Sequence, residues 1–283
     1  MYKIIKKRQL AETIALFEIE AAEVAKKVQP GQFVIIRYDE QGERIPLTVM
    51  DFDRVRGTVT IVVQGVGYSS TMINQLREGD EVLDFVGPLG TPTEIEKYGT
   101  VACVGGGLGI APIYPIARAL KEAGNHVISV LGSRSAELLI LEEEMRSVSN
   151  ELVIATNDGS AGVQGLVTDG LAHILNQGKT IQVIWVIGPM IMMKAVAEYT
   201  RSLGIKTIVS MNPIMVDGTG MCGACRISVG GETKFACVDG PEFDGHLVDF
   251  TLAMQRLSYF KDEENRAKAR LQCDQHDKGG RRA

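Results

Sequence analysis

Three cysteines and one aspartate near the C-terminal end form the pattern with the clearest chemistry in this sequence. Asp217, Cys222, Cys225 and Cys237 are spaced D-x4-C-x2-C-x11-C, on a loop that contains several glycines. Two thiolates three residues apart can bind one metal centre together, and the plant-type [2Fe–2S] spacing is C-x4-C-x2-C followed by a distant cysteine. Asp217 occupies the first position of that spacing, where its carboxylate can supply an oxygen ligand to iron. The pattern predicts a [2Fe–2S] centre with one oxygen and three sulfur ligands.

Two other interpretations of these residues stay open. The spacing of Cys222 and Cys225 fits zinc equally well, and Cys237 with His246 would complete a Cys3His zinc site. Asp217, which is followed by glycine, is also typical of a turn that binds no metal. A zinc-stapled nucleotide-binding module would be a regulatory protein without redox activity.

A glycine-rich stretch lies in the middle of the chain, between an apolar run and a predicted helix. Residues 101–105 read VACVG and are followed by GGLGIAP. Such a turn at a helix N-terminus presents backbone N–H groups and the helix dipole to a pyrophosphate. The stretch departs from G-x-G-x-x-G, because Ile110 stands where the third glycine is expected, so a tight strand-to-helix turn remains an alternative. The candidate nucleotide-binding residues are Gly106, Gly107, Gly109, Ile110, Ala111 and Pro112.

The elements that must position these residues are of two kinds. Residues 1–97 contain short runs rich in Val, Ile, Phe and Thr, which predict a small antiparallel β-barrel with one helix over 69–76. Over 98–210, apolar runs alternate with helical patterns, which is typical of a doubly wound parallel sheet covered on both faces. Residues 211–250 contain too few apolar residues to form a core of their own, so a bound metal is expected to stabilise their fold. Residues 251–283 predict a helix and a charged tail.

The expected fold is therefore multidomain, with a β part and an α/β part. The predicted strands are 13–18, 32–37, 44–49, 57–64 and 81–86 in the barrel and 100–104, 127–131, 152–156, 181–187 and 207–210 in the parallel sheet. The predicted helices of the α/β part are 111–123, 135–147, 166–176 and 190–203.

Composition narrows the classes of function. The 283 residues include 30 Lys and Arg and 35 Asp and Glu, and the net charge of −5 argues against nucleic acid or an anionic membrane as the main partner. Residues 98–117 are uncharged, but their five glycines and two prolines favour a strand, loop and helix over a membrane span. Five cysteines without an export signal argue against a disulfide framework and predict a cytoplasmic protein. Outside the motifs, Cys103 is expected in the core, and no role is assigned to Cys273, His126, His173 or His276.

The strand-ending Gly-Gly-Gly-x-Gly-Ile-Ala-Pro, after a small barrel and before a cysteine-bearing segment, resembles the ferredoxin–NADP reductase superfamily. Within it, the chain is similar to electron-transfer subunits of dihydroorotate dehydrogenase and, more closely, to the small subunits of NADH-dependent reduced ferredoxin:NADP oxidoreductases. The resemblance covers about residues 1–260. Its most specific element is Asp217, since a dihydroorotate dehydrogenase subunit is expected to have cysteine at that position.

The resemblance implies FAD in the barrel. In the superfamily an Arg-x-aromatic-Ser/Thr strand holds the flavin, and the related stretch RIPLT places Thr48 in the hydroxyl position and Arg44 one residue early. Residues 65–71, which open the short helix, would bind the FAD pyrophosphate, with a helix-capping turn as the alternative. The implied flavin-binding residues are Arg44, Pro46, Leu47, Thr48, Gly65, Gly67, Ser69, Ser70 and Thr71.

The resemblance also implies a nicotinamide nucleotide. TNDGS at 156–160 resembles the nicotinamide-side loop of the family, and VIGPMIMM at 186–193 resembles its Cys-Gly-Pro…Met motif, with Ile187 in place of cysteine. The strand end at Ser133 and Arg134 lacks the acidic residue usual in NAD sites, so NAD(H) is expected from the resemblance alone. The implied binding residues are Asn157, Asp158, Gly159, Gly188 and Pro189.

By the same resemblance, the chain is an electron-transfer flavoprotein subunit. NAD(H) exchanges a hydride with FAD, which passes single electrons to the [2Fe–2S] cluster and on to a partner. The implied partner is a larger flavin and [4Fe–4S] subunit that uses NADP(H) and ferredoxin, in electron bifurcation. This chemistry requires no catalytic acid–base pair or nucleophile.

Overall fold

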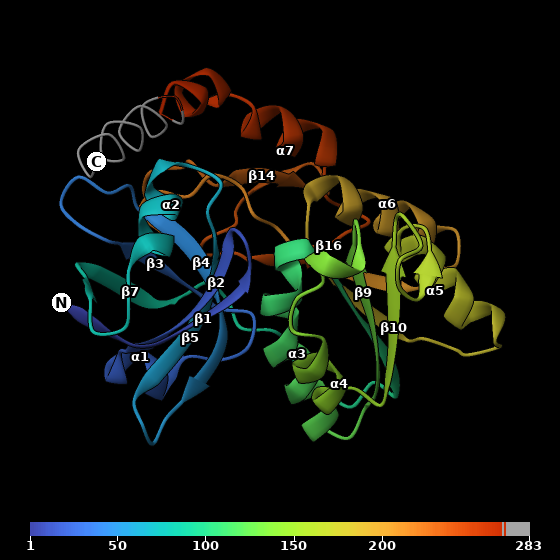
Figure 1. Cartoon of the computed structure of the whole chain (residues 1–283). Helices are drawn as coiled ribbons and strands as arrows, with labels where there is room; N and C mark the ends of the chain where they lie inside the picture. Colours follow the sequence, from blue (N-terminus) through green and yellow to red (C-terminus); the bar gives the residue numbers. More distant parts are fainter. Residues whose placement is uncertain (268, 270–283) are drawn as a thin grey trace.

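The first seven strands form one antiparallel sheet that is nearly closed into a barrel (Figure 1). The computed structural model describes residues 1–267 and 269, so Cys273 and His276 lie outside the described residues. The sheet order is β6-β1-β2-β5-β4-β3-β7, and a single residue separates β6 from β7, so one segment joins both edges. The strands are β1 (Tyr2–Ala11), β2 (Ile14–Glu20), β3 (Phe33–Arg37), β4 (Ile45–Asp53), β5 (Thr58–Gln64), β6 (Glu81–Val82) and β7 (Asp84–Leu89).

Strand β1 and the short helix α1 (Ala22–Lys27) were not predicted from the sequence. Four of the ten residues of β1 are Lys or Arg and only Ile4 is buried, so the strand lacks the apolar alternation that marks its neighbours. It is held by a long antiparallel pairing with β2 instead. The predicted helix of the barrel is α2 (Tyr68–Gln75).

The second sheet has the order β11-β10-β9-β8-β12-β13-β16 and is parallel from β11 to β13. Helices α3 and α4 cover one face, and α5 and α6 cover the other (Figure 1). Alternate residues of one strand enter the two cores: Cys103 faces α3, and Val104 faces α5 and α6. The predicted doubly wound α/β fold is confirmed. Its elements are β8 (Thr100–Gly106), η1 (Gly107–Gly109), α3 (Ile110–Glu122), β9 (His126–Ser133), η2 (Ala136–Leu138), α4 (Glu142–Val148), β10 (Glu151–Thr156), β11 (Val163–Gln164), α5 (Val167–Asn176), β12 (Val183–Ile187), α6 (Met190–Arg201) and β13 (Lys206–Ser210).

The helix predicted over 135–147 is interrupted. Residues 139–141 leave the helical path between η2 and α4, and Leu141 has a φ of 57°. Ile140 and Leu141 are buried in the core between α3 and the sheet, so tertiary packing of these apolar residues overrides local helix propensity.

The C-terminal segment is built onto the α/β unit. A hairpin of β14 (Arg226–Val229) and β15 (Glu232–Phe235) is followed by β16 (Glu242–Asp244), which pairs antiparallel with β13, and by α7 (Phe250–Leu257). The parallel sheet predicted over 98–210 is thus extended by one antiparallel strand from the C-terminal segment, which was not predicted. Buried residues of the segment share one core with α6 and with Phe33 and Ile35 of β3. In the described part of the chain, no helix is long and apolar enough to cross a membrane.

Candidate functional site

The cysteine-bearing loop runs from Asp217 to Cys225 and lies against Cys237. Cys225 and Cys237 are buried free thiols, with their sulfur atoms 3.2 Å apart. Burial and the adjacent Cys225 thiol raise the pKa of Cys237 to about 12, and the N–H of Gly220 donates to its sulfur. Gly218 and Gly220 have φ values of 77° and 85°, which glycine adopts without strain, so the loop can curl over the sulfur atoms.

Asp217 and Cys222 form a second pair on the same loop. The Asp217 carboxylate accepts the N–H of Thr219 at 2.9 Å and the N–H of Cys222 at 3.0 Å. These backbone donors, Thr219 foremost, hold the pKa of Asp217 below its usual value, so the side chain carries a negative charge. Asp217 thus forms the turn that the sequence left open, and it places its carboxylate beside Cys222.

The two pairs suit a binuclear centre. A [2Fe–2S] cluster has two protein ligands on each iron, and the pairs Cys225/Cys237 and Asp217/Cys222 match that donor set. A structural zinc site requires four donors around one point. The residues therefore fit an iron–sulfur cluster.

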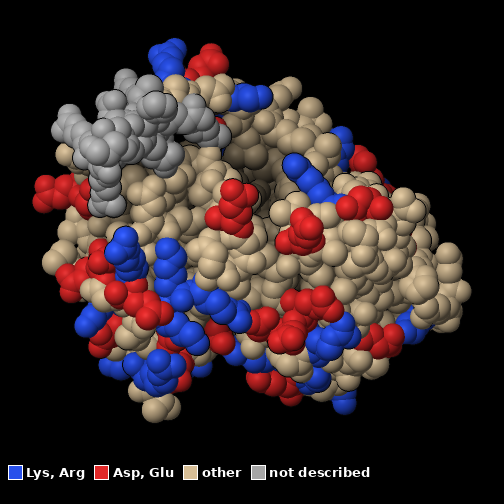
Figure 2. Space-filling model, viewed as in Figure 1, with Lys and Arg blue, Asp and Glu red and all other residues tan. Residues whose placement is uncertain are grey.

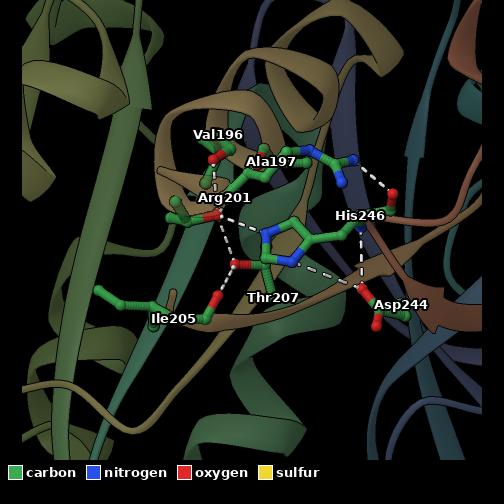
Figure 3. Close-up of polar contacts among 8 residues, drawn as sticks. Val196, Ala197, Arg201, Ile205, Thr207, Asp244 and His246 are labelled. Atoms are coloured by element: carbon green, nitrogen blue, oxygen red, sulfur yellow. Dashed lines mark hydrogen bonds and ion pairs between the residues drawn. The ribbon is translucent and has the colours of Figure 1, made fainter. Parts of the chain in front are cut away.

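His246, the fourth ligand of the zinc interpretation, is engaged elsewhere (Figure 3). Its Nε2 lies 3.1 Å from the hydroxyl of Thr200 on α6, which lies 2.6 Å from the hydroxyl of Thr207 on β13. The Arg201 guanidinium donates to the His246 carbonyl, and the His246 N–H donates to Asp244 at 2.9 Å. The imidazole therefore ties the C-terminal segment to α6, and these contacts argue against His246 as the fourth ligand of a Cys3His site.

The glycine-rich turn at the end of β8 packs against the start of α6. A Cβ added to Gly109 would lie 2.1 Å from the carbonyl oxygen of Ile187, and one added to Gly106 would lie 2.2 Å from the sulfur of Met192. A Cβ on Gly188 would likewise lie 3.1 Å from the Gly106 carbonyl oxygen. The structure thus brings Gly106, Gly107 and Gly109 together with Gly188 and Pro189. Met192 packs between Gly106 and Gly188. Its part in this contact was not predicted from the sequence.

The next three predicted residues offer little side-chain surface to a ligand, and the N–H of Ile110 already donates to the carbonyls of Gly107 and Leu108. Ile110 and Ala111 are buried against the sheet, and Pro112 has no N–H to offer. The chain runs from β8 outward through β9 and β10 and then returns to β12 on the other side of β8. Ligands of open α/β sheets bind at the carboxyl ends of the strands at such a switch point.

The predicted nicotinamide-side loop follows β10 at the same edge of the sheet, two strands from the glycine turn. Asn157 and Asp158 are exposed, and their N–H groups donate to the carbonyls of Ser133 and Arg134, each at 3.2 Å. The Asp158 carboxylate accepts the hydroxyl of Ser160 at 2.6 Å and its N–H at 3.0 Å. Its charge is therefore used inside the loop, whereas the exposed Asn157 side chain makes no hydrogen bond to the residues that the structure describes.

In the barrel, Thr48 lies on β4, opposite Phe33 of β3, and is half-buried. The Ser70 hydroxyl accepts the N–H groups of Val66 and Gly67 at 3.0 and 2.9 Å, and the Thr71 hydroxyl donates to the Gly67 carbonyl at 2.7 Å. These two hydroxyls therefore make the helix cap that the sequence left open. The N–H groups of residues 68–70 have no acceptor within the described chain, which leaves them for an anion.

Two further predicted flavin residues have partners that the sequence did not reveal. The Ser69 hydroxyl donates to the Glu43 carboxylate at 2.9 Å and accepts the Glu43 N–H at 3.1 Å. Arg44 donates through Nε to the carbonyl of Val216, at 2.9 Å, immediately before the cysteine-bearing loop. Neither contact has a sequence signal, because each joins residues far apart in the chain.

The barrel strand that carries Thr48 lies beside the helix that starts at the glycine turn. Arg118 on α3 forms an ion pair with Asp51 on β4 at 2.7 Å, and η1 contacts β5. A hollow opens on this face between the barrel and the α/β unit, with charged side chains of both signs at its rim and many more below it (Figure 2). Two cavities, of about 460 Å³ beside Arg118 and about 210 Å³ beside Arg201, contain none of the predicted cofactor residues.

Comparisons with known proteins agree with this arrangement. Residues 212–249 match the iron–sulfur cluster binding domain of dihydroorotate dehydrogenase B, and residues 103–198 match the oxidoreductase NAD-binding domain. The chain is 50% identical to a dihydroorotate dehydrogenase B electron transfer subunit homolog from Thermotoga maritima, over 93% of this chain and 92% of the relative. It is 34% identical to the electron transfer subunit of that enzyme from Geobacillus thermodenitrificans, over 85% of this chain and 94% of the relative.

One solved structure covers almost the whole chain. A chain of NADH-dependent reduced ferredoxin–NADP oxidoreductase, solved for its bearing on flavin-based electron bifurcation, is 48% identical with a TM-score of 0.91. The match spans 96% of this chain and 98% of the other.

Proposed function

The chain belongs to the family of dihydroorotate dehydrogenase B electron-transfer subunits and their homologues, and from this we propose that it passes electrons between NAD(H), FAD and a [2Fe–2S] cluster as one subunit of a larger oxidoreductase. The observation that carries the proposal is the donor set of the C-terminal loop. Two ligand pairs, three sulfurs and one oxygen in all, suit a two-iron cluster.

Residues in different parts of the chain would bind different cofactors. The free N–H groups at the start of α2 would bind the FAD pyrophosphate, and Thr48 would hydrogen-bond near the reactive flavin nitrogen. The glycine turn of β8 would bind the nucleotide pyrophosphate, with Gly188 and Pro189 beside the nicotinamide. Bound FAD supplies a carrier that accepts a hydride and releases electrons singly. Side chains thus bind and orient cofactors, and none needs to act as acid or base.

For the partner, we propose a larger flavin and [4Fe–4S] subunit that uses NADP(H) and ferredoxin. Support comes from the 48% identity to a chain of NADH-dependent reduced ferredoxin–NADP oxidoreductase over nearly the full length. The alternative is an electron-transfer subunit of dihydroorotate dehydrogenase, favoured by the 34% relatives. Asp217 argues for the first, because the second is expected to have cysteine there. We also propose a cytoplasmic location, since free buried thiols are typical of a reducing compartment.

The visible absorption spectrum of the purified protein, with iron, zinc and flavin analysis, tests the proposal. We expect flavin and iron–sulfur absorption, one FAD per chain and two irons per chain. A colourless protein that contains zinc would show the function to be wrong.

A further inference from the structure

Barrel residues contact the cysteine-bearing loop on both sides of Asp217, the proposed oxygen ligand. Arg44, at the entrance to β4, donates through Nε to the carbonyl of Val216, whose peptide leads directly into Asp217. The next residue, Gly218, is pressed against the barrel: a Cβ there would lie 2.7 Å from the Cδ1 atoms of both Ile35 and Leu89. The peptides on either side of Asp217 are therefore both fixed by barrel residues.

The segment after Cys237, the last of the four proposed ligands, is also held by a residue at the end of the barrel. The hydroxyl of Thr91, just past β7, donates to the carbonyl of Val238 at 3.1 Å, and its N–H donates to the carbonyl of Gly240 at 2.6 Å. Val238 follows Cys237 directly. Among these contacts, Arg44 is the only charged side chain, and its guanidinium forms no ion pair within the part of the chain that the structure describes.

We propose that Arg44 is a positioning residue for the iron–sulfur centre, which holds the peptide that leads into Asp217 and brings a positive charge to the edge of the cysteine-bearing loop. The inference rests on the proposed function, and it gives Arg44 a role that its flavin-strand position did not predict. A guanidinium keeps its charge at any working pH and donates in a fixed plane, so it can hold one peptide carbonyl in one orientation. Its charge also favours the reduced cluster, which is the more negative state.

The test compares Arg44→Met with the wild type, both purified with their cofactors. We expect Arg44→Met to retain FAD but to show altered g-values in the EPR spectrum of the reduced cluster, a lower midpoint potential and a partial loss of iron. Arg44→Lys retains the charge without the planar fork, so its midpoint potential should return toward the wild-type value. Arg54→Met is the matched control, because Arg54 donates to the carbonyl of Val28 elsewhere on the barrel, and it should leave g-values, potential and iron content unchanged.

The possible outcomes separate this inference from the function on which it rests. If Arg44→Met has the g-values, midpoint potential and iron content of the wild type, Arg44 does not position the cluster, whether or not FAD is retained. A loss of FAD with an unaltered cluster would assign Arg44 to the flavin site instead. A wild-type protein with FAD and no [2Fe–2S] signal would overturn the proposed function itself.

Discussion

In the proposed site, Asp217 is the residue on which the redox character depends. Its carboxylate is charged, lies beside Cys222 and is oriented by two backbone N–H groups. Of the other candidate oxygen and nitrogen ligands, Asp239 accepts the N–H of Phe235 at 2.6 Å, and His246 lies against Thr200. Only Asp217 is placed to pair with Cys222.

Substitution of Asp217 should therefore separate the cluster from the flavin. We expect Asp217→Ala to lose cluster occupancy while FAD remains bound in the barrel. Asp217→Cys should retain a [2Fe–2S] centre with shifted g-values and midpoint potential, because sulfur replaces oxygen on one iron. Iron analysis, flavin analysis and EPR of the reduced proteins measure these effects. Full iron content in Asp217→Ala, together with iron loss in Asp239→Ala or His246→Ala, would refute this ligand assignment.

At the scale of elements, the nucleotide site depends on the close approach of β8 to β12. Gly109 has a φ of −62°, which any residue can adopt. Glycine is therefore required at this position only because there is no room for a side chain. A methyl group there would meet the carbonyl oxygen of Ile187, which is backbone and cannot move aside. The turn and the start of α6 must then separate.

We predict that Gly109→Ala weakens NADH binding and slows flavin reduction by roughly 10- to 100-fold, because the binding groups are displaced. Overpacking should also lower the free energy of unfolding by about 1–3 kcal/mol. FAD and iron content should stay at wild-type values. Gly204→Ala is the control: Gly204 has a φ of 67° and open space around it, so this change should cost about 1 kcal/mol and leave NADH kinetics unaltered. Equal NADH kinetics in the two variants would contradict the steric argument.

Local patterns in the sequence predict most of the helices, strands and motifs. They fail where contacts between residues far apart in the chain determine the structure. The apolar runs and glycine turns locate the sheet and the turn at Gly106 correctly, because strand, turn and helix preferences act over a few residues. The antiparallel strand β16 is short, and its place beside β13 depends on the packing of the whole C-terminal segment. The contacts of Arg44 and His246 cross between units, and that of Glu43 joins two separate parts of the barrel, so none has a local signal.

At the scale of the whole molecule, the carboxyl of the half-buried Glu242 joins the three units. Glu242 on β16 accepts the hydroxyl of Thr93, in the linker after the barrel, at 2.5 Å. The buried indole N–H of Trp185 on β12 lies near the same carboxyl without a hydrogen-bond partner of its own among the residues described. Burial raises the pKa of Glu242 to about 7.

This carboxyl should make stability depend on pH. Because the folded protein binds the proton more tightly than the unfolded chain, its stabilising effect is complete below about pH 4.5 and is lost as the pH rises to about 7. The loss should be roughly 3 kcal/mol. Glu242→Gln stays neutral and can still bond Thr93, so it should lack this dependence. Melting temperatures of both proteins between pH 5 and 8 test the prediction, and parallel curves would contradict it.

The most direct test of the proposed electron path is a single-turnover reaction of the purified protein with NADH, followed by flavin absorbance and by EPR of rapidly frozen samples. We expect NADH to bleach the flavin first and the reduced [2Fe–2S] signal to appear afterwards, with NADPH reacting much more slowly. A flavin that stays oxidised in NADH, a clear preference for NADPH, or a cluster that stays oxidised beside fully reduced flavin would contradict it.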